Sequence, residues 1–430
     1  EPIPDGPAEE TKPLNRLDRR EWKLTSLGLL SSSTSHLGDR RGRSGLKSEG
    51  GTSASQDAVA RALDWLARHQ STDGSWRSQR HTDQCKGTCT MRRPSYYGNN
   101  HGDPAFDIGT TGLAMLAFSG AGLTHQFGAK KEYVNVLKRA VKFLLSEQLE
   151  SGDPRIDGCY GPQTHRKWVY NHAIATLAMC ELYLMSGDAL RLRRSTRRAV
   201  ELLLGARNPG RAWRYGYRPG DDDVSIAGWA LLALKAAQAV NTGVDRTRID
   251  IAIEETLRYL RGVTETRTGR TGYSLRGQGD NHHKWPGIRF DQGKSCMTSV
   301  SALCRLLGGE RRSTRDLRRS IDLLSAHPPT WTEPSPKLVS PSPESNVSTI
   351  NFYYWYHASY ALFQHGGNAW NAWNKKLLSA LVPAQRQDGG CETGSWDPVG
   401  EWANRGGRVY STALAAMTLE VYYRFRRVSR

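Results

Sequence analysis

A pair of helical segments recurs six times along this chain of 430 residues, and this recurrence limits the fold more than any other feature. Each unit of roughly 60 residues holds an amphipathic segment, a loop rich in Gly, Trp and Arg, and a second segment that is more apolar. The first segments predict helices at 57–69, 132–147, 196–205, 249–261, 314–325 and 370–382. The second segments predict helices at 107–120, 170–185, 223–240, 295–307, 352–363 and 408–424.

The two sets of helices differ in how much of their surface is apolar. In the first set the apolar residues fall on one face, as Val136, Val141 and Leu144 do at helical spacing. The second set is small and apolar almost all round, as at 112–117 and 228–234, and helices of that kind are buried. We therefore predict an all-α fold over residues 55–430, an (α/α)6 toroid whose inner barrel of helices is ringed by outer helices. Residues 1–54 lack this periodicity and are predicted to form a flexible N-terminal segment or linker.

Charge and cysteine content narrow the classes of partner. The net charge is +18, yet the basic residues are spread over outer-helix segments, as at 191–198 and 311–319, without an aromatic-interleaved strand motif. This distribution indicates a solvated surface and argues against nucleic acid, while a diphosphate or an anionic membrane surface stays open. No run approaches the roughly 18 apolar residues of a membrane span. Seven cysteines form no disulfide framework, although Cys85 and Cys89 lie close enough in sequence to pair in an oxidising compartment.

A short motif ends several of the outer helices. Residues 70–76 read Gln-Ser-Thr-Asp-Gly-Ser-Trp, a looser copy stands at 387–396, and a third stands at 208–213. Gln can bind a helix end, Gly allows a left-handed turn, and Trp can pack over that turn. The motif resembles the Q-x3-G-x-W repeat of the squalene and oxidosqualene cyclases. With the six hairpins, the resemblance to the toroids of squalene cyclases and protein prenyltransferases extends over about residues 55–425, and the chain is most similar to bacterial prenyltransferase and squalene oxidase repeat proteins.

The beginnings of the inner helices are predicted to surround one mouth of the ring. Aligning these helices on their small residues, such as Gly112 and Gly228, brings aromatic, acidic and basic side chains into register at their first turns. Candidate residues of this mouth are Tyr170, His172, Trp229, Tyr354, His357, Arg408 and Tyr410. Aromatic side chains of this kind line cavities for isoprenoid chains, stack on sugars, or fill a core.

The acidic candidates for catalysis are Asp221, Asp222 and Asp223, together with Asp107 at the same register in another inner helix. The resemblance implies that an Asp-rich segment at this place protonates an alkene, since packed carboxylates raise one pKa and keep a proton available. Here Val224 and Ser225 follow the acids, where the cyclases have Thr. The alternative is that Asp222 or Asp223 caps the helix by accepting its first N–H groups.

A metal site is weakly indicated at another pair of inner helices. Cys296 and His357 stand where a resemblance to protein prenyltransferases implies the cysteine and histidine ligands of zinc. Lys294 occupies the place of the expected aspartate, so Asp291 would have to reach in from the loop. We therefore predict no metal and no cofactor, with His357 as a buried, hydrogen-bonded histidine.

Three functions remain open from the sequence. The resemblance implies binding or transformation of an isoprenoid or polyprenyl lipid in the central cavity, so that the partner is a hydrophobic small molecule. The second function is a non-catalytic scaffold of the cell envelope that binds a protein or glycan at the mouth. Because the sequence begins at Glu1 without Met, we expect a leader or anchor to precede it, which favours the envelope or periplasm over the cytoplasm. The third is an (α/α)6 glycan hydrolase or lyase, for which Asp107 and Asp223 are the paired carboxylates.

Overall fold

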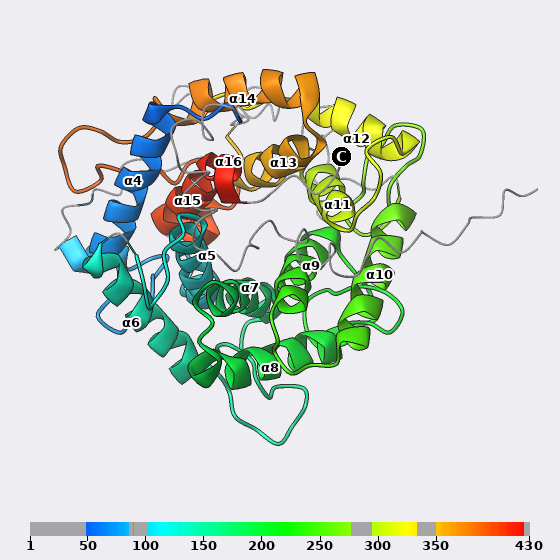
Figure 1. The fold of residues 1–430 in the computed structure, drawn as a ribbon, viewed down its shortest axis with the longest axis horizontal. Coiled ribbons are helices and arrows are strands. Elements are labelled where there is room, and N and C mark those ends of the chain that lie inside the picture. The colour runs from blue at the N-terminus through cyan, green and yellow to red at the C-terminus, as the bar shows by residue number, and fades with distance from the viewer. Residues whose placement is uncertain are drawn as a thin grey trace, which may run out of the picture.

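A computed structural model describes residues 49–85, 89, 102–128, 130–276, 295–332 and 350–424. The regular elements of these ranges are helices, and they form two concentric rings (Figure 1). The outer helices are α4 (Ser53–Arg68), α6 (Lys131–Glu147), α8 (Ala189–Ala206), α10 (Arg246–Gly262), α12 (Arg315–Ser325) and α14 (Gly367–Leu381). The inner helices are α5 (Asp107–Gly120), α7 (Trp168–Ser186), α9 (Val224–Ala239), α11 (Cys296–Leu307), α13 (Phe352–His365) and α15 (Ala403–Leu419).

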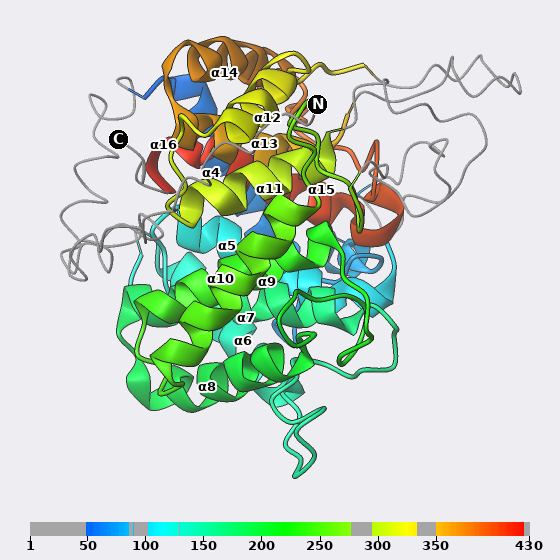
Figure 2. The same cartoon turned by 90° about the vertical axis from the view of Figure 1, so that its right-hand side faces the viewer.

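The predicted (α/α)6 toroid is confirmed. Inner helix α15 packs against α5, so the sixth hairpin meets the first and the ring closes. Figure 2, turned by 90°, has outer helix α10 covering inner helix α9. The N-terminal segment predicted at 1–54 lies outside the described residues apart from its last six positions, and α4 already begins at Ser53. Among the described helices, none combines the length and hydropathy that a membrane span requires.

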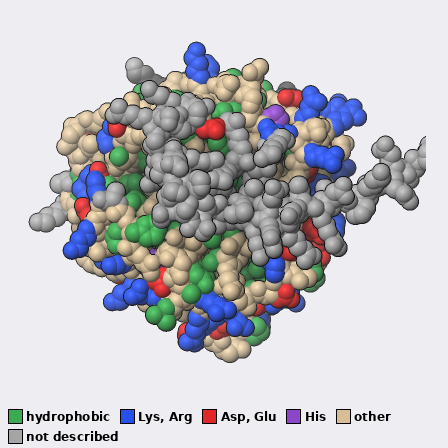
Figure 3. Space-filling view, in the orientation of Figure 1, with side chains coloured by type: hydrophobic (Ala, Val, Ile, Leu, Met, Phe, Trp, Pro, Cys, Tyr) green, Lys and Arg blue, Asp and Glu red, His purple; other side chains and the backbone are tan. Residues whose placement is uncertain are grey.

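Burial follows the two sequence patterns. Of the 16 residues of α9, all but the last are buried, as expected for a helix that is apolar on every side. Outer helix α6 buries one stripe, which includes Val136, Val141 and Leu144, and exposes the opposite side to solvent. The basic side chains of the described residues that Figure 3 shows lie mostly near the edge of this face, with acidic ones among them.

The Gln-Gly-Trp motif joins one hairpin to the next. The Gln70 side-chain amide donates to the carbonyls of Gly74 and Val136, each at 2.9 Å, and so connects the loop after α4 to helix α6. Gly74 has φ +96°, and a Cβ there would lie 2.3 Å from the Arg139 carbonyl oxygen, so that only glycine fits. The indole of Trp76 donates to the Leu66 carbonyl at 2.8 Å and covers the turn.

The sixth copy of this motif closes the ring, and its glutamine was wrongly placed by the sequence. The prediction put it at Gln387, but Gln385 makes the contacts, donating to the carbonyls of Gly394 at 2.9 Å and Ala58 at 2.8 Å. Ala58 belongs to α4, so Gln385 joins the last hairpin to the first. The error arose because extra residues separate the glutamine from Gly394 and Trp396, and the intervening Gln387 stands before a plausible Asp-Gly turn.

A buried ion network lies where the short helix α16 (Val421–Arg424) meets the inner ring. The Arg424 guanidinium contacts Glu181 at 2.7 Å and Glu420 at 3.4 Å, and all three side chains are at most 1% exposed. It also donates to the Leu116 carbonyl at 2.5 Å. This network links α16 to α5, α7 and α15, and removing the Arg424 guanidinium would leave Glu181 buried without this cation.

Candidate functional site

A central cavity lies at the beginnings of the inner helices, where the mouth was predicted. All six helices contribute to its wall, with Gly109, Tyr170, Trp229, Met297, Tyr353 and Tyr410. Its volume is about 120 Å³. One water needs roughly 10–15 Å³ on this measure, so the cavity has room for a small organic molecule rather than a single solvent molecule.

The wall of this cavity is mainly apolar and aromatic. The Trp229 ring stacks on Tyr356, with centroids 5.8 Å apart and planes at 14°, and meets His357 edge-on at 5.4 Å. The Ser225 and Tyr353 hydroxyls are hydrogen-bonded at 2.8 Å between α9 and α13. Packing and this bond hold the aromatic rings in place, as a preformed ligand pocket requires.

Two polar atoms at the cavity wall find no hydrogen-bond partner among the described residues. They are the hydroxyl of Tyr410 and Oδ1 of Asn171, and both are buried. A buried polar atom without a partner costs about 1–3 kcal/mol, so such atoms call for an explanation. A ligand hydroxyl could satisfy both, because it can donate to Asn171 Oδ1 and accept from the Tyr410 hydroxyl.

One side of the cavity comes from a segment that no sequence pattern indicated. Glu401, Trp402 and Arg405 line the cavity at the beginning of α15, which was predicted to begin only at position 408. The helix is interrupted at Gly407, which has φ 60°, and Trp402 has φ 67°, an unusual value for a residue with a side chain. Non-glycine residues held at positive φ cluster at functional sites. The sequence signal that could have indicated this interruption is the pair Gly406–Gly407.

Asp223 lies just behind the cavity wall. One carboxylate oxygen caps α9 by accepting from the Ile226 amide at 2.8 Å, and the other accepts from the Tyr273 hydroxyl at 3.3 Å. Tyr273 itself lines the cavity. Burial raises the pKa of Asp223 to about 7, against the lowering effects of the Ile226 amide and the Arg214 charge. The carboxyl group therefore titrates near neutral pH and lies one tyrosine away from the cavity.

The other three predicted acids are engaged elsewhere. Asp221 pairs with Arg214, and Asp222 contacts the Arg211 guanidinium at 2.6 Å. Asp107 accepts from the backbone amide and the hydroxyl of Ser78, both at 2.8 Å, and burial raises its pKa. None of these three carboxylates is among the cavity-lining residues that the structure describes.

The predicted mouth residues divide into two groups. Tyr170, Trp229 and Tyr410 line the cavity, and the remaining four do not. His172 bonds to the Ala199 carbonyl of outer helix α8 at 3.0 Å, and burial lowers its pKa to about 4. Tyr354 donates to the His327 carbonyl at 3.0 Å, which lies beyond α12.

The last two mouth candidates also make contacts away from the cavity. Arg408 contacts Asp397 at 2.8 Å, in the loop that leads to α15. His357 bonds through Nδ1 to the Tyr353 carbonyl at 2.9 Å and packs behind Trp229. The register of small residues therefore located the ring of helix beginnings, but four of the seven named residues lie on a helix face that points away from the cavity.

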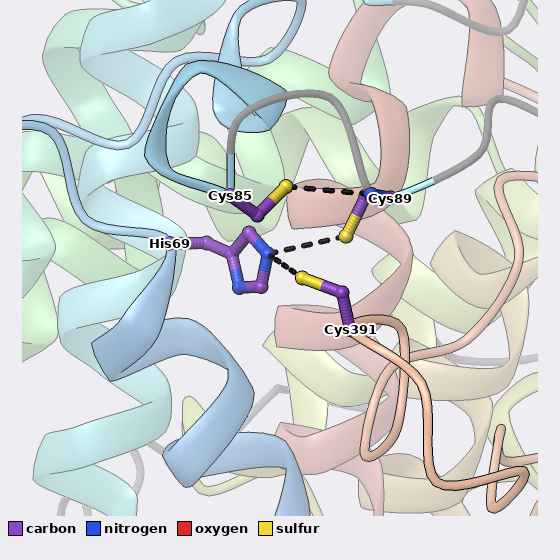
Figure 4. Close-up of side chains that lie close together, drawn as sticks. All are labelled: His69, Cys85, Cys89 and Cys391. Carbon is purple, nitrogen blue, oxygen red and sulfur yellow. Dashed lines mark hydrogen bonds between the residues drawn. The ribbon is translucent and has the colours of Figure 1, made fainter.

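The structure describes two of the three weak zinc candidates of the inner helices, Cys296 and His357. Cys296 lines the cavity and accepts from the Asn351 amide at 3.2 Å, while Asp291 lies outside the described residues. Within the described part of the chain, the metal-ligating side chains that converge are instead His69, Cys85, Cys89 and Cys391 (Figure 4). The sequence did not suggest this cluster, because 322 positions separate His69 from Cys391.

Comparisons with known proteins support the class of fold. No protein-family model matches the chain. The chain is similar to a squalene–hopene cyclase of Zymomonas mobilis, with 26% identity over 209 residues, which is 44% of this chain and 27% of the cyclase. Among solved structures, an α-1,6-mannanase from Salegentibacter superposes with a TM-score of 0.56 at 9% identity, covering 86% of this chain and all of the mannanase.

A second solved structure, an α-amylase from Clostridium perfringens, superposes with a TM-score of 0.51 at 11% identity, covering 85% of this chain and 97% of the amylase. The chain is therefore an α/α-toroid protein. Within that class, its sequence likeness is to squalene cyclases, as the repeat motif suggested, although the matched stretch is only about a quarter of the cyclase's length.

Proposed function

We propose that the central cavity binds an isoprenoid or a similar apolar chain that ends in one polar group. The observation that carries this proposal is the wall itself, which is apolar and aromatic and is built from the beginnings of all six inner helices. Apolar walls with a few placed polar groups are the usual environment of a small apolar ligand. The unpartnered atoms of Tyr410 and Asn171 favour an alcohol over a pure hydrocarbon, because a hydroxyl can donate to Asn171 Oδ1 and accept from Tyr410.

Asp223 is the group best placed for a chemical step on such a ligand. With a pKa of about 7, it retains a proton in a substantial fraction of molecules at neutral pH. Tyr273 lies between it and the cavity and is the route by which a proton would reach a double bond. The faces of Trp229 and Tyr353 would then stabilise the cation formed. The corresponding reaction class is proton-initiated isomerisation or cyclisation of an alkene.

Titration with farnesol tests the binding proposal. Farnesol carries one hydroxyl on an apolar chain, so it should bind more tightly than squalene, which has no polar group. Replacing Tyr410 by Phe removes the hydroxyl at the cavity and should weaken farnesol binding about three- to tenfold, as expected for one hydrogen bond. The matched control is Tyr354→Phe in α13, since that hydroxyl bonds to the outer layer and not at the cavity. Equal affinities for wild type and Tyr410→Phe would contradict the proposed placement of the polar group.

Glycan hydrolysis is the second candidate. It is supported by the fold of the Salegentibacter mannanase, one structure of which is an inactive variant with two consecutive aspartates replaced, in complex with α-1,6-mannotriose. This chain also has consecutive aspartates at 221–223. Glycosidases need two carboxylates facing the substrate, whereas Glu401 is the one carboxylate among the described residues that line the cavity. Release of reducing sugar from α-1,6-mannotriose, abolished in Asp223→Asn, would favour this candidate over the isoprenoid.

A further inference from the structure

Four metal-ligating side chains meet where the sixth hairpin joins the first. We call them the seam cluster: His69, Cys85, Cys89 and Cys391 (Figure 4). His69 is the C-terminal cap of outer helix α4, and Cys85 ends the short helix η1 (His81–Cys85). Cys391 comes from the loop between α14 and α15, within the segment that separates Gln385 from Gly394. The cluster shares no residue with the central cavity wall.

The donor atoms of the seam cluster are as close as one metal ion would bring them. All four lie within 4.8 Å of one another, and His69 Nε2 is 3.2 Å from the Cys89 sulfur and 3.3 Å from the Cys391 sulfur. In a tetrahedral zinc site with Zn–S of about 2.3 Å and Zn–N of about 2.0–2.1 Å, the ligand atoms are about 3.5–3.8 Å apart. A small rearrangement of side chains would therefore accommodate the ion.

The histidine is oriented as a metal ligand. Its Nδ1 lies 2.8 Å from the Trp65 carbonyl oxygen, which can only accept, so the ring proton is on Nδ1. Nε2 is then unprotonated and faces the sulfurs of Cys89 and Cys391. The ring is fixed by stacking on Trp65, with centroids 4.2 Å apart. A histidine that binds a metal through one ring nitrogen usually donates its other N–H to a backbone carbonyl or a carboxylate, which fixes the orientation of the ring.

We propose that the seam cluster is a structural zinc site that fastens the closure of the ring. Three thiolates and one imidazole are a common zinc ligand set, and the Cys-x3-Cys spacing of Cys85 and Cys89 falls in the range of two to four intervening residues found in such sites. Four protein ligands leave no open coordination position, so the role is structural and not catalytic. On binding, the three thiols lose their protons and the site carries a net charge of −1. Arg68, which donates to the Thr393 carbonyl at 3.1 Å beside Cys391, supplies a neighbouring positive charge.

A disulfide is the competing use of these cysteines. Pairing any two of them would leave the third thiol and the oriented imidazole without a function. The structure has no disulfide among its described cysteines. Zinc uses all four groups, and it joins positions 69 and 391, so that it constrains a very long loop in the unfolded chain. We expect the ion to raise the thermal stability of the whole protein.

Metal analysis of the full-length wild-type chain tests the site without any assay of activity. The protein is purified with a reducing agent, and zinc is counted by inductively coupled plasma mass spectrometry. About one zinc per chain is expected, with an X-ray absorption spectrum that fits three sulfurs at about 2.3 Å and one nitrogen at about 2.0–2.1 Å. Less than one-fifth of an equivalent after incubation with zinc chloride, or a sulfur count below three, would overturn the proposal. A disulfide between two of the cluster cysteines in the freshly reduced, zinc-treated protein would do the same.

Two variants locate the ion. Cys391→Ser, in a partly exposed loop, should lose zinc and lower the melting temperature, and zinc chelation should lower the melting temperature of the wild type but leave that of Cys391→Ser unchanged. Cys304→Ala is the matched control, because Cys304 is a buried cysteine of α11 outside the cluster and this variant should retain its zinc. Full zinc occupancy in Cys391→Ser would contradict the assignment. If that variant does not fold, the absorption spectrum of the wild type still decides the ligand set.

Discussion

Replacing Asp223 by Asn should change the pH dependence of stability in a defined direction. The folded carboxyl has a pKa of about 7, against 3.8 for an exposed aspartate. Between these values the folded protein holds a proton that the unfolded chain has released. The contribution of Asp223 to the free energy of unfolding is therefore greatest below about pH 4 and falls as the pH rises toward 7. The shift of roughly three pKa units, at 1.36 kcal/mol per unit, corresponds to a total loss of about 4 kcal/mol.

The asparagine variant retains a side chain that can cap α9 but has no titrating group. Urea unfolding of both proteins at pH 5 and pH 8 covers about two of the roughly three pH units over which the contribution of Asp223 changes. We expect the free energy of unfolding of Asp223→Asn, relative to wild type, to increase by about 3 kcal/mol between these pH values. A difference that stays constant within about 0.5 kcal/mol would mean that Asp223 is ionised throughout, and it would refute both the raised pKa and the role of Asp223 as a proton donor.

Two further predictions concern contacts that hold the ring together, and a third concerns Lys235, a buried lysine of α9. Gln385→Ala should lower the free energy of unfolding in a denaturant titration by about 1–3 kcal/mol, because two buried carbonyls lose their donor. The control is Gln387→Ala: this side chain is exposed, so the free energy of unfolding should change by less than about 0.5 kcal/mol. Arg424→Met should lower the free energy of unfolding by about 3–5 kcal/mol, because Glu181 and Glu420 lose the Arg424 cation. A melting temperature at neutral pH equal to that of the wild type would disprove the importance of this network. Burial lowers the pKa of Lys235 to about 7, so between about pH 7 and pH 10 the unfolded chain binds a proton that the folded protein does not. The contribution of Lys235 to stability therefore rises with pH over this range. In urea titrations, Lys235→Met should make the free energy of unfolding less dependent on pH there.

The helices could be predicted from sequence because their signals are local. All twelve predicted helices are present, and the inner helix at 107–120 has the predicted bounds. Periodicity and apolar content depend on residues that are close in sequence, so they can be recognised without knowledge of the fold. The same holds for the capping role of Asp223, which depends on a contact three residues away.

The residues of the cavity were harder to predict because they depend on how each helix is rotated. His172 and Tyr354 share the register of the mouth but face the outer layer, while Asn171 and Tyr353, one position earlier, face the cavity. The kink at Gly407 turns Glu401 and Arg405 inward, and no local pattern distinguishes such a kink from a loop.

The seam cluster was not predictable because its parts are separated in the chain. Cys85 and Cys89 were singled out as a pair, but Cys391 and His69 join them only through closure of the ring. Long-range contacts of this kind leave no periodic trace in a single sequence.

If the central cavity takes an apolar chain, the heat capacity should fall when that chain binds. Calorimetric titration of the wild type with farnesol at several temperatures should give a clearly negative heat-capacity change, which is the marker of apolar surface leaving water. Ile174 lines the cavity, so Ile174→Trp should abolish this signal by filling the space, while Ile174→Leu, of equal volume, should preserve it. An absence of farnesol binding, together with binding of α-1,6-mannotriose that is lost in Ile174→Trp, would contradict the account and assign the cavity to a glycan.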